Sequence, residues 1–310
     1  MLFPVIAIAA FGAVPHTTER TVTQIADGVY VIIHKDVSDS WPEGNTTVII
    51  GDRGVFVVDA CFLTASAKED IAEIRRLTPK PVRYLLNTHW HIDHNAGNSA
   101  YVEAFPGVEI VSQSATKRIM SGKNRGVAEN WAAPDGLLAK EIAGLKSTQA
   151  GGKGDFGKPF TDQEKAELVQ QIADRQVQMA DYKTYRFATP TLTFERSLTL
   201  DLGNRIVEIR NNGRATTDGD AFVYLPKQKI LVTGDIVVSP LPYTGGSFPS
   251  EWRNTLRMMA AMDFAALVPG HGPIERDKTY LHELIALLDS VISQVGERVT
   301  KMRSMAIAQF

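Results

Sequence analysis

The chain has little cysteine, no surplus of basic residues and no long apolar run. A single thiol, Cys61, excludes an internal disulfide and a metal site built from thiolates alone. The 33 Lys and Arg residues are balanced by 35 Asp and Glu residues, whereas nucleic-acid-binding proteins usually carry a basic patch. We therefore expect no nucleic-acid partner. No apolar run reaches the roughly 20 residues of a membrane-spanning helix, so no integral membrane segment is expected.

A shorter uncharged apolar run occupies residues 2–13. Its length fits the core of a signal peptide, and Ala10, Gly12 and Ala13 lie near a candidate cleavage point. The basic residues that usually precede such a core are missing, so a first core strand is the alternative. We expect residues 1–20 to be a signal peptide with a short leader. The protein would then be periplasmic or secreted, and a retained leader would make it cytoplasmic.

From about Gly28 onward, β-branched runs alternate with helical patterns. The pattern predicts a buried strand at residues 55–60, a helix at 66–77 and a strand at 82–87. After a helical stretch, strands resume with one predicted at residues 192–200. Alternation of strands and helices is typical of an α/β architecture.

The middle of the chain differs, because residues 116–188 contain no convincing strand. Thr161 and Glu164 match the capping-box pattern at the start of a helix that we expect to end near Ala180. We expect a helical insertion over one face of a single domain that spans residues 21–310. This insertion is a candidate lid. A last amphipathic helix is predicted at residues 278–302, covering a sheet.

Residues 89–94 read His-Trp-His-Ile-Asp-His, directly after a predicted strand. Neutral imidazole and carboxylate are good zinc ligands. His89 and His91 point the same way if the segment is extended, while Asp93 and His94 can serve a second point beyond the bend. Trp90, on the opposite side of the strand, is expected to lie in the core.

Two later turns carry candidate completing ligands. Asp235 follows Gly234 after one predicted strand, and His271 lies between two glycines after another. These residues and the histidine cluster offer more ligands than one ion takes comfortably. The pattern therefore indicates a bridged pair of metal ions about 3.5–4 Å apart.

The HxHxDH pattern of residues 89–94, with the later Gly-Asp and Gly-His turns, resembles the metallo-β-lactamase superfamily of hydrolases. The resemblance extends from about Gly28 to the C-terminus. It implies a four-layer αβ/βα sandwich of two mixed sheets flanked by helices, with the metal site at one edge. It also implies a first metal on His89 and His91, a second on Asp93, His94 and His271, and Asp235 as the bridge.

One position departs from the family pattern. The first metal usually takes another histidine from a turn before the bridging aspartate, and Thr216 stands there in the matching segment, residues 213–220. A neutral hydroxyl is a poor zinc ligand. Three possibilities stay open: the second site alone is filled, both fill at high zinc with a water next to Thr216, or the scaffold has lost catalysis.

The resemblance implies a zinc-dependent hydrolase in which a metal-bound hydroxide attacks a small ester, thioester, lactone or β-lactam carbonyl. Asp93 is the candidate catalytic residue, because it can orient the nucleophile and manage its proton. The alternatives are a catalytically weak or inactive metal-binding relative, and a non-haem iron oxygenase of the same fold. We expect one or two zinc ions and a small-molecule substrate, with the oligomeric state left open.

Two loops carry aromatic residues that would suit an apolar group of a substrate. Residues 35–45 contain Trp41, and residues 239–252 contain Tyr243, Phe248 and Trp252. Ordinary packing of these loops on the core is the alternative.

Overall fold

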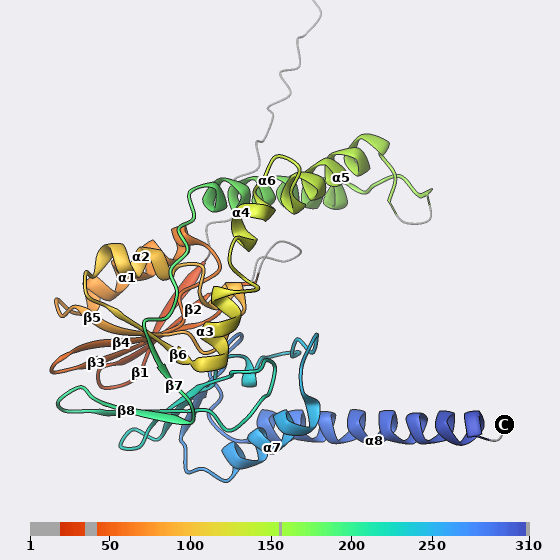
Figure 1. The fold of residues 1–310 in the computed structure, drawn as a ribbon. Coiled ribbons are helices and arrows are strands. Elements are labelled where there is room, and N and C mark those ends of the chain that lie inside the picture. Colours follow the sequence, from red (N-terminus) through yellow and green to blue (C-terminus); the bar gives the residue numbers. More distant parts are fainter. Residues whose placement is uncertain (1–18, 35–41, 155–156, 308–310) are drawn as a thin grey trace, which may run out of the picture.

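The computed structural model describes residues 19–34, 42–154 and 157–307, with side chains described up to Met302. Most of the predicted signal peptide and Trp41 lie outside these residues. Two sheets pack face to face and carry helices on their outer faces (Figure 1). None of the helices in the described segments is long and apolar enough to cross a membrane.

Seven strands of the described chain form the larger sheet, in the order β1-β2-β3-β4-β5-β6-β7. Neighbours are antiparallel from β1 to β4 and parallel from β4 to β7. The strands are β1 (Arg20–Ala26), β2 (Val29–His34), β3 (Thr46–Gly51), β4 (Gly54–Val58), β5 (Val82–Leu86), β6 (Glu109–Gln113) and β7 (Leu192–Phe194).

The smaller sheet has five strands within the described residues, in the order β12-β11-β10-β9-β8. Only β11 and β12 pair in parallel, and the other neighbours in this sheet are antiparallel. The strands are β8 (Ser197–Asp201), β9 (Ile206–Arg210), β10 (Phe222–Leu225), β11 (Ile230–Val232) and β12 (Ala266–Val268).

Three apolar clusters define the layers. Side chains such as Val31, Phe56 and Val223 fill the space between the two sheets. The outer face of the larger sheet packs on α1 (Thr64–Leu77) and α2 (Asn98–Ala104), and that of the smaller sheet packs on α7 (Pro249–Ala260) and α8 (Thr279–Ile307). The predicted sandwich of two mixed sheets flanked by helices is confirmed.

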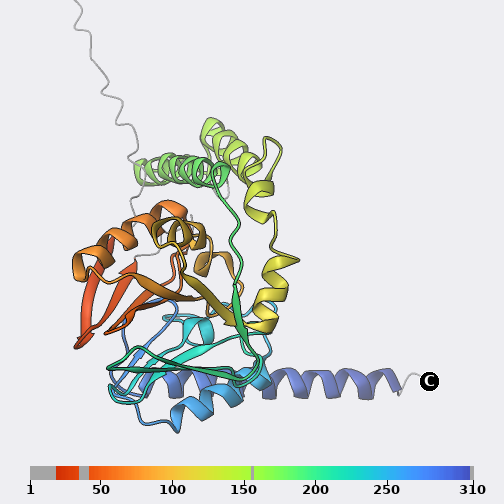
Figure 2. The ribbon, with the colours of Figure 1, turned by 60° about the vertical axis from the view of Figure 1, so that its left-hand side comes forward.

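The described residues between β6 and β7 form four α-helices; in Figure 2 the yellow ones run along one side of the sandwich and the green ones lie above its orange helices. They are α3 (Ser114–Ser121), α4 (Val127–Trp131), α5 (Leu137–Gly151) and α6 (Asp162–Lys183). The predicted capping box is present: Thr161 Oγ1 accepts from Glu164 N, and the Glu164 carboxylate accepts from Thr161 N. The helix ends at Lys183, slightly beyond the predicted end.

One strand prediction is wrong, and one strand was missed. The predicted strand at residues 192–200 is two strands, β7 and β8, which belong to different sheets. Its apolar alternation has the same phase on both sides of the exposed bend at Glu195 and Arg196, which hides the crossing from one sheet to the other. The edge strand β1 was not predicted, because its sequence RTVTQIA is mostly polar and its side chains are only partly buried.

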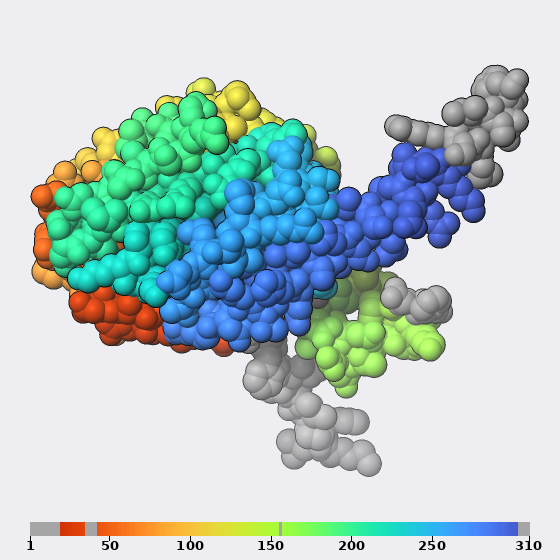
Figure 3. Space-filling view, turned by 90° about the horizontal axis from the view of Figure 1, so that it is seen from below, coloured from red at the N-terminus to blue at the C-terminus, as the bar shows by residue number. Residues whose placement is uncertain are grey.

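The last helix only partly covers a sheet. Leu281, Leu284 and Leu288 of α8 are buried in the cluster that includes α7. The rest of the helix extends away from the body (Figure 3), and Val295 is 56% exposed. The amphipathic pattern predicted the helix but not where its contacts end.

Candidate metal centre

The loops that follow β5, β11 and β12 bring the predicted ligands together. β4 and β5 are parallel neighbours in the larger sheet, and β11 and β12 are parallel neighbours in the smaller one. In α/β folds, sites form outside the carboxyl ends of such strands. Residues 89–94 follow β5, while Asp235 and His271 follow β11 and β12. All six predicted metal ligands fall into two overlapping groups.

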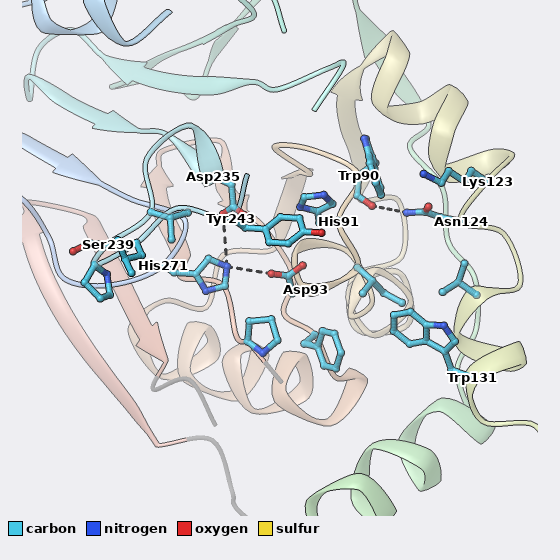
Figure 4. A pocket seen from close by; sticks show the side chains of 17 residues that line it. Trp90, His91, Asp93, Lys123, Asn124, Trp131, Asp235, Ser239, Tyr243 and His271 are labelled. Carbon is cyan, nitrogen blue, oxygen red and sulfur yellow. Dashed lines mark hydrogen bonds and ion pairs between the residues drawn. The ribbon is translucent and has the colours of Figure 1, made fainter. Parts of the chain in front are cut away.

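The second-metal group consists of Asp93, His94, Asp235 and His271, whose ligand atoms all lie within 4.8 Å of one another. His271 Nε2 is 3.1 Å from Asp93 Oδ2 and 3.3 Å from His94 Nε2. In Figure 4, dashed lines join one ring nitrogen of His271 to the carboxylates of Asp93 and Asp235. All four residues are buried. Two imidazoles and two carboxylates form a complete donor set for a divalent ion such as zinc.

The first-metal group consists of His89, His91 and Asp235, within the same 4.8 Å limit. The ring centroids of His89 and His91 are 4.6 Å apart. Asp235 Oδ2 lies 3.5 Å from His89 Nε2, while its Oδ1 lies 3.1 Å from His94 Nε2. One carboxylate oxygen therefore faces each group, which suits a residue that bridges two metal ions.

The charges and unmet hydrogen bonds of the cluster fit a divalent cation. Among the described residues, His89 Nε2 and Asp235 Oδ1 are buried and have ion-pair contacts but no hydrogen bond of good geometry, which is costly unless another group satisfies them. Burial raises the pKa of Asp93 and Asp235, but His94 outweighs this effect and holds both below the ordinary value. Burial and His89 lower the pKa of His91 to about 3. Ionised carboxylates and a neutral imidazole are the forms that bind metal.

Asp59 sets the orientation of two ligand rings. It follows β4, and its Oδ2 lies 2.8 Å from His94 Nδ1. The Thr88 hydroxyl donates to Asp59 Oδ2 across 2.8 Å and lies 3.0 Å from His89 Nδ1. Because the Thr88 hydroxyl donates its proton to Asp59, its oxygen accepts a hydrogen bond from His89 Nδ1–H. In the neutral form that metal binding requires, both rings would carry their proton on Nδ1 and present the Nε2 lone pair to the cluster.

Sequence reasoning missed Asp59 and a close contact behind His94. A Cβ added at Gly44 would lie 2.7 Å from His94 Cε1, so only glycine lets the chain pass behind this ring. The sequence offered a weak signal for Asp59, a lone carboxylate after a buried apolar strand. The same signal is typical of an ordinary turn residue.

The Thr216 side chain forms a hydrogen bond within its own loop. Its hydroxyl donates to Asp220 Oδ1 across 2.6 Å, and the other oxygen of Asp220 accepts from Thr217 N at 2.8 Å. The side chain is thus engaged in bracing its own loop. The first-metal group has three protein ligands and the second-metal group has four.

A pocket of about 690 Å³ opens beside the cluster, and His91, Asp93, Asp235 and His271 lie in its wall. Its remaining lining is mostly apolar and includes Phe62, Trp90, Ile92, Val127, Trp131 and Tyr243. The pocket therefore joins a metal-binding cluster to a surface that suits an apolar group.

The predictions for the aromatic residues were partly wrong. Trp90 lines the pocket instead of the core, with Lys123 Nζ 5.0 Å from its ring centroid. The strand ends at Leu86, so alternation along a strand does not extend to Trp90. Tyr243 lines the pocket, but Trp252 is fully buried on α7 and donates to Ile236 O across 2.8 Å. Phe248 lies beneath the Arg214 guanidinium, 4.0 Å from ring centroid to Cζ.

The family model of the metallo-beta-lactamase superfamily matches residues 40–271. The chain belongs to the metallo-beta-lactamase superfamily. Members are metal-dependent hydrolases, including sulfatases and β-lactamases, and they use divalent metals, usually zinc. A metallo-beta-lactamase from Pontibacter korlensis has a similar fold, with a TM-score of 0.60 at 19% identity over 87% of this chain and 99% of that one. The DIM-1 metallo-beta-lactamase has a TM-score of 0.60 at 17% identity, over 89% of this chain and all of its own.

Two curated relatives from the same superfamily are sulfatases. A linear primary-alkylsulfatase of Pseudomonas sp. is 22% identical over 82% of this chain and 46% of its own length. An alkyl/aryl-sulfatase of Saccharomyces cerevisiae is 24% identical over 67% of this chain and 29% of its own length. The chain thus spans less than half the length of each relative.

Proposed function

We propose that the protein is a zinc-dependent hydrolase of a small ester that carries an apolar group. One observation carries the proposal: the metal-ligand cluster opens into a pocket lined mostly by aromatic and aliphatic side chains. The two sulfatase relatives make a sulfate ester of an apolar alcohol the first substrate class to test. Carboxylic esters, thioesters, lactones and β-lactams are the alternative, since the same cluster would face a carbonyl.

The residues of the two groups have separate roles in this reaction. His89, His91 and Asp235 would hold one ion, and Asp93, His94, Asp235 and His271 the other. When bound, zinc lowers the pKa of a coordinated water to about 7 and polarises the oxygen of the scissile group. The ionised Asp93 carboxylate orients the attacking water and accepts its proton. The apolar lining holds the rest of the substrate and excludes bulk water.

The test compares hydrolysis of octyl sulfate, p-nitrophenyl octanoate and a cephalosporin by the zinc-loaded protein and by Asp93→Asn. We expect turnover of one substrate class to fall by about 10²–10⁴-fold in the variant. Asp162→Asn, which removes a fully exposed carboxylate on α6, is the control and should leave turnover unchanged. If the metal-loaded protein turns over none of these substrates, and no thioester or lactone either, the inactive metal-binding relative is correct. Bound iron with oxygen-dependent turnover would instead establish the oxygenase.

A further inference from the structure

The helical insertion supplies the wall of the pocket that lies opposite the metal ligands. Val127 and Trp131 of α4 line this side, together with Asn124 of the preceding loop. Figure 4 shows Trp131 and His271 on opposite sides of the pocket, with Asp93 between them. An apolar group that extends from the metal cluster therefore runs toward Trp131.

Trp131 is held in place from behind by α6. Its ring stacks on Tyr182, with centroids 6.2 Å apart and an interplanar angle of 30°. Tyr182 is 1% exposed, and its hydroxyl donates to Phe62 O across 3.2 Å. Because Phe62 also lines the pocket, these three rings connect the insertion directly to the pocket floor.

The end of α6 is also tied to the sandwich. The Asp181 carboxylate accepts hydrogen bonds from Thr64 N at 2.9 Å and Ala65 N at 3.0 Å. These amides belong to the first turn of α1, where free N–H groups and the helix dipole favour an anion. Two separate attachments, one polar and one aromatic, thus hold the base of the insertion against the body. These attachments favour a fixed wall over the lid considered in the sequence analysis.

We propose that Trp131 is the specificity-determining residue that limits the length of the apolar group a substrate can place in this pocket. The inference rests on the proposed function, because it describes the substrate of the same site. Each methylene buried before the chain reaches Trp131 should tighten binding about fourfold, the equivalent of roughly 0.8 kcal/mol. Beyond that length the Trp131 indole blocks the pocket, so additional methylenes are not buried and do not tighten binding.

Binding of n-alkanesulfonates, from butanesulfonate to dodecanesulfonate, tests this without turnover, because a carbon–sulfur bond replaces the ester. Calorimetry on the zinc-loaded protein should give a Kd that falls with chain length and then levels off. In Trp131→Ala the levelling point should move to longer chains, while the shortest sulfonates bind as in the native protein. Trp131→Leu, which keeps an apolar contact on Tyr182, should give a smaller shift and serves if the alanine variant does not fold.

The matched control is Leu137→Ala, which removes an exposed apolar side chain of the same insertion outside the pocket lining. It should keep the native levelling point. The proposal is overturned if the levelling point is the same in native protein, Trp131→Ala and Trp131→Leu, or if Kd does not depend on chain length. Chain-length-dependent binding without hydrolysis of any ester would refute the hydrolase and leave the role of Trp131 standing. Hydrolysis of an ester, together with an unchanged dependence of Kd on chain length in both Trp131 variants, would support the hydrolase and refute the role of Trp131.

Discussion

The Thr216 hydroxyl donates to the Asp220 carboxylate across 2.6 Å, at the position where the family pattern has a metal-binding histidine. The interaction turns the side chain toward its own loop and leaves the first-metal group with three protein ligands, against four in the second. The two groups should therefore differ in metal affinity.

The first prediction concerns metal content. At a low free zinc concentration we expect about one ion per native chain, held by the four-ligand group. We expect about two ions per chain in Thr216→His, because the variant restores a nitrogen donor to the first-metal group. Elemental analysis and chelator competition measure this. Thr216→Ser keeps the hydroxyl and is the control. Two equally tight ions in the native protein would show that Thr216 is no obstacle.

The second prediction concerns Asp59, whose carboxylate orients His94. Asp59→Asn keeps the shape and tolerates the left-handed backbone at this position, where φ is 64°. Replacing such a partner of a metal ligand should weaken metal binding about 10- to 100-fold, as measured by chelator competition. Asp201→Asn removes an exposed carboxylate that belongs to neither metal group and should bind metal normally. Unchanged affinity in Asp59→Asn would contradict this role.

The third prediction concerns stability at alkaline pH. His34 Nδ1 faces Gly44 O at 2.8 Å and Nε2 faces Asp70 Oδ1 at 2.9 Å, so both ring nitrogens must donate. Burial lowers the pKa of His34, but Asp70 outweighs it and the pKa is raised to about 9, from 6.5 in the unfolded chain. The protonated ring therefore stabilises the folded state fully below pH 6.5, and this contribution is lost as pH rises through about 9.

Urea unfolding between pH 6 and 10 measures the effect. The native free energy of unfolding should fall with pH by about 3 kcal/mol more than that of His34→Gln, which cannot titrate. His282→Gln removes an exposed histidine of α8 and should follow the native curve. If the free energy of unfolding depends on pH in the same way in native protein and His34→Gln, Asp70 does not raise the pKa of His34 as described.

The candidate ligands could be predicted because their signal is local. Three histidines and an aspartate within residues 89–94 need only one turn after a strand to point at a common centre. Asp235 and His271 were found because each follows a glycine at a strand end. Asp59 was missed because its role depends on His94, 35 residues further along the chain. No pattern in the residues around either one records that contact.

The same reasoning explains the errors in the fold. Helix α6 is predicted by its capping box, which lies within four consecutive residues. The break between β7 and β8 is decided by which sheet each strand joins, and the apolar alternation, which resumes in the same phase after Arg196, does not show it. Trp131 lines the pocket because Tyr182, from another helix, supports its ring. Such contacts arise only from the assembled fold.

His271 Nε2 and Asp93 Oδ2 lie 3.1 Å apart, yet 178 residues separate them in sequence. A metal ion on the second-metal group would join the loop after β5 to the loops after β11 and β12, and so connect the two sheets. It would act as a removable cross-link between distant segments, and it would stabilise the folded state because the unfolded chain does not hold the assembled site. Because the chain has one cysteine and cannot form an internal disulfide, the ion can serve as the cross-link between these segments.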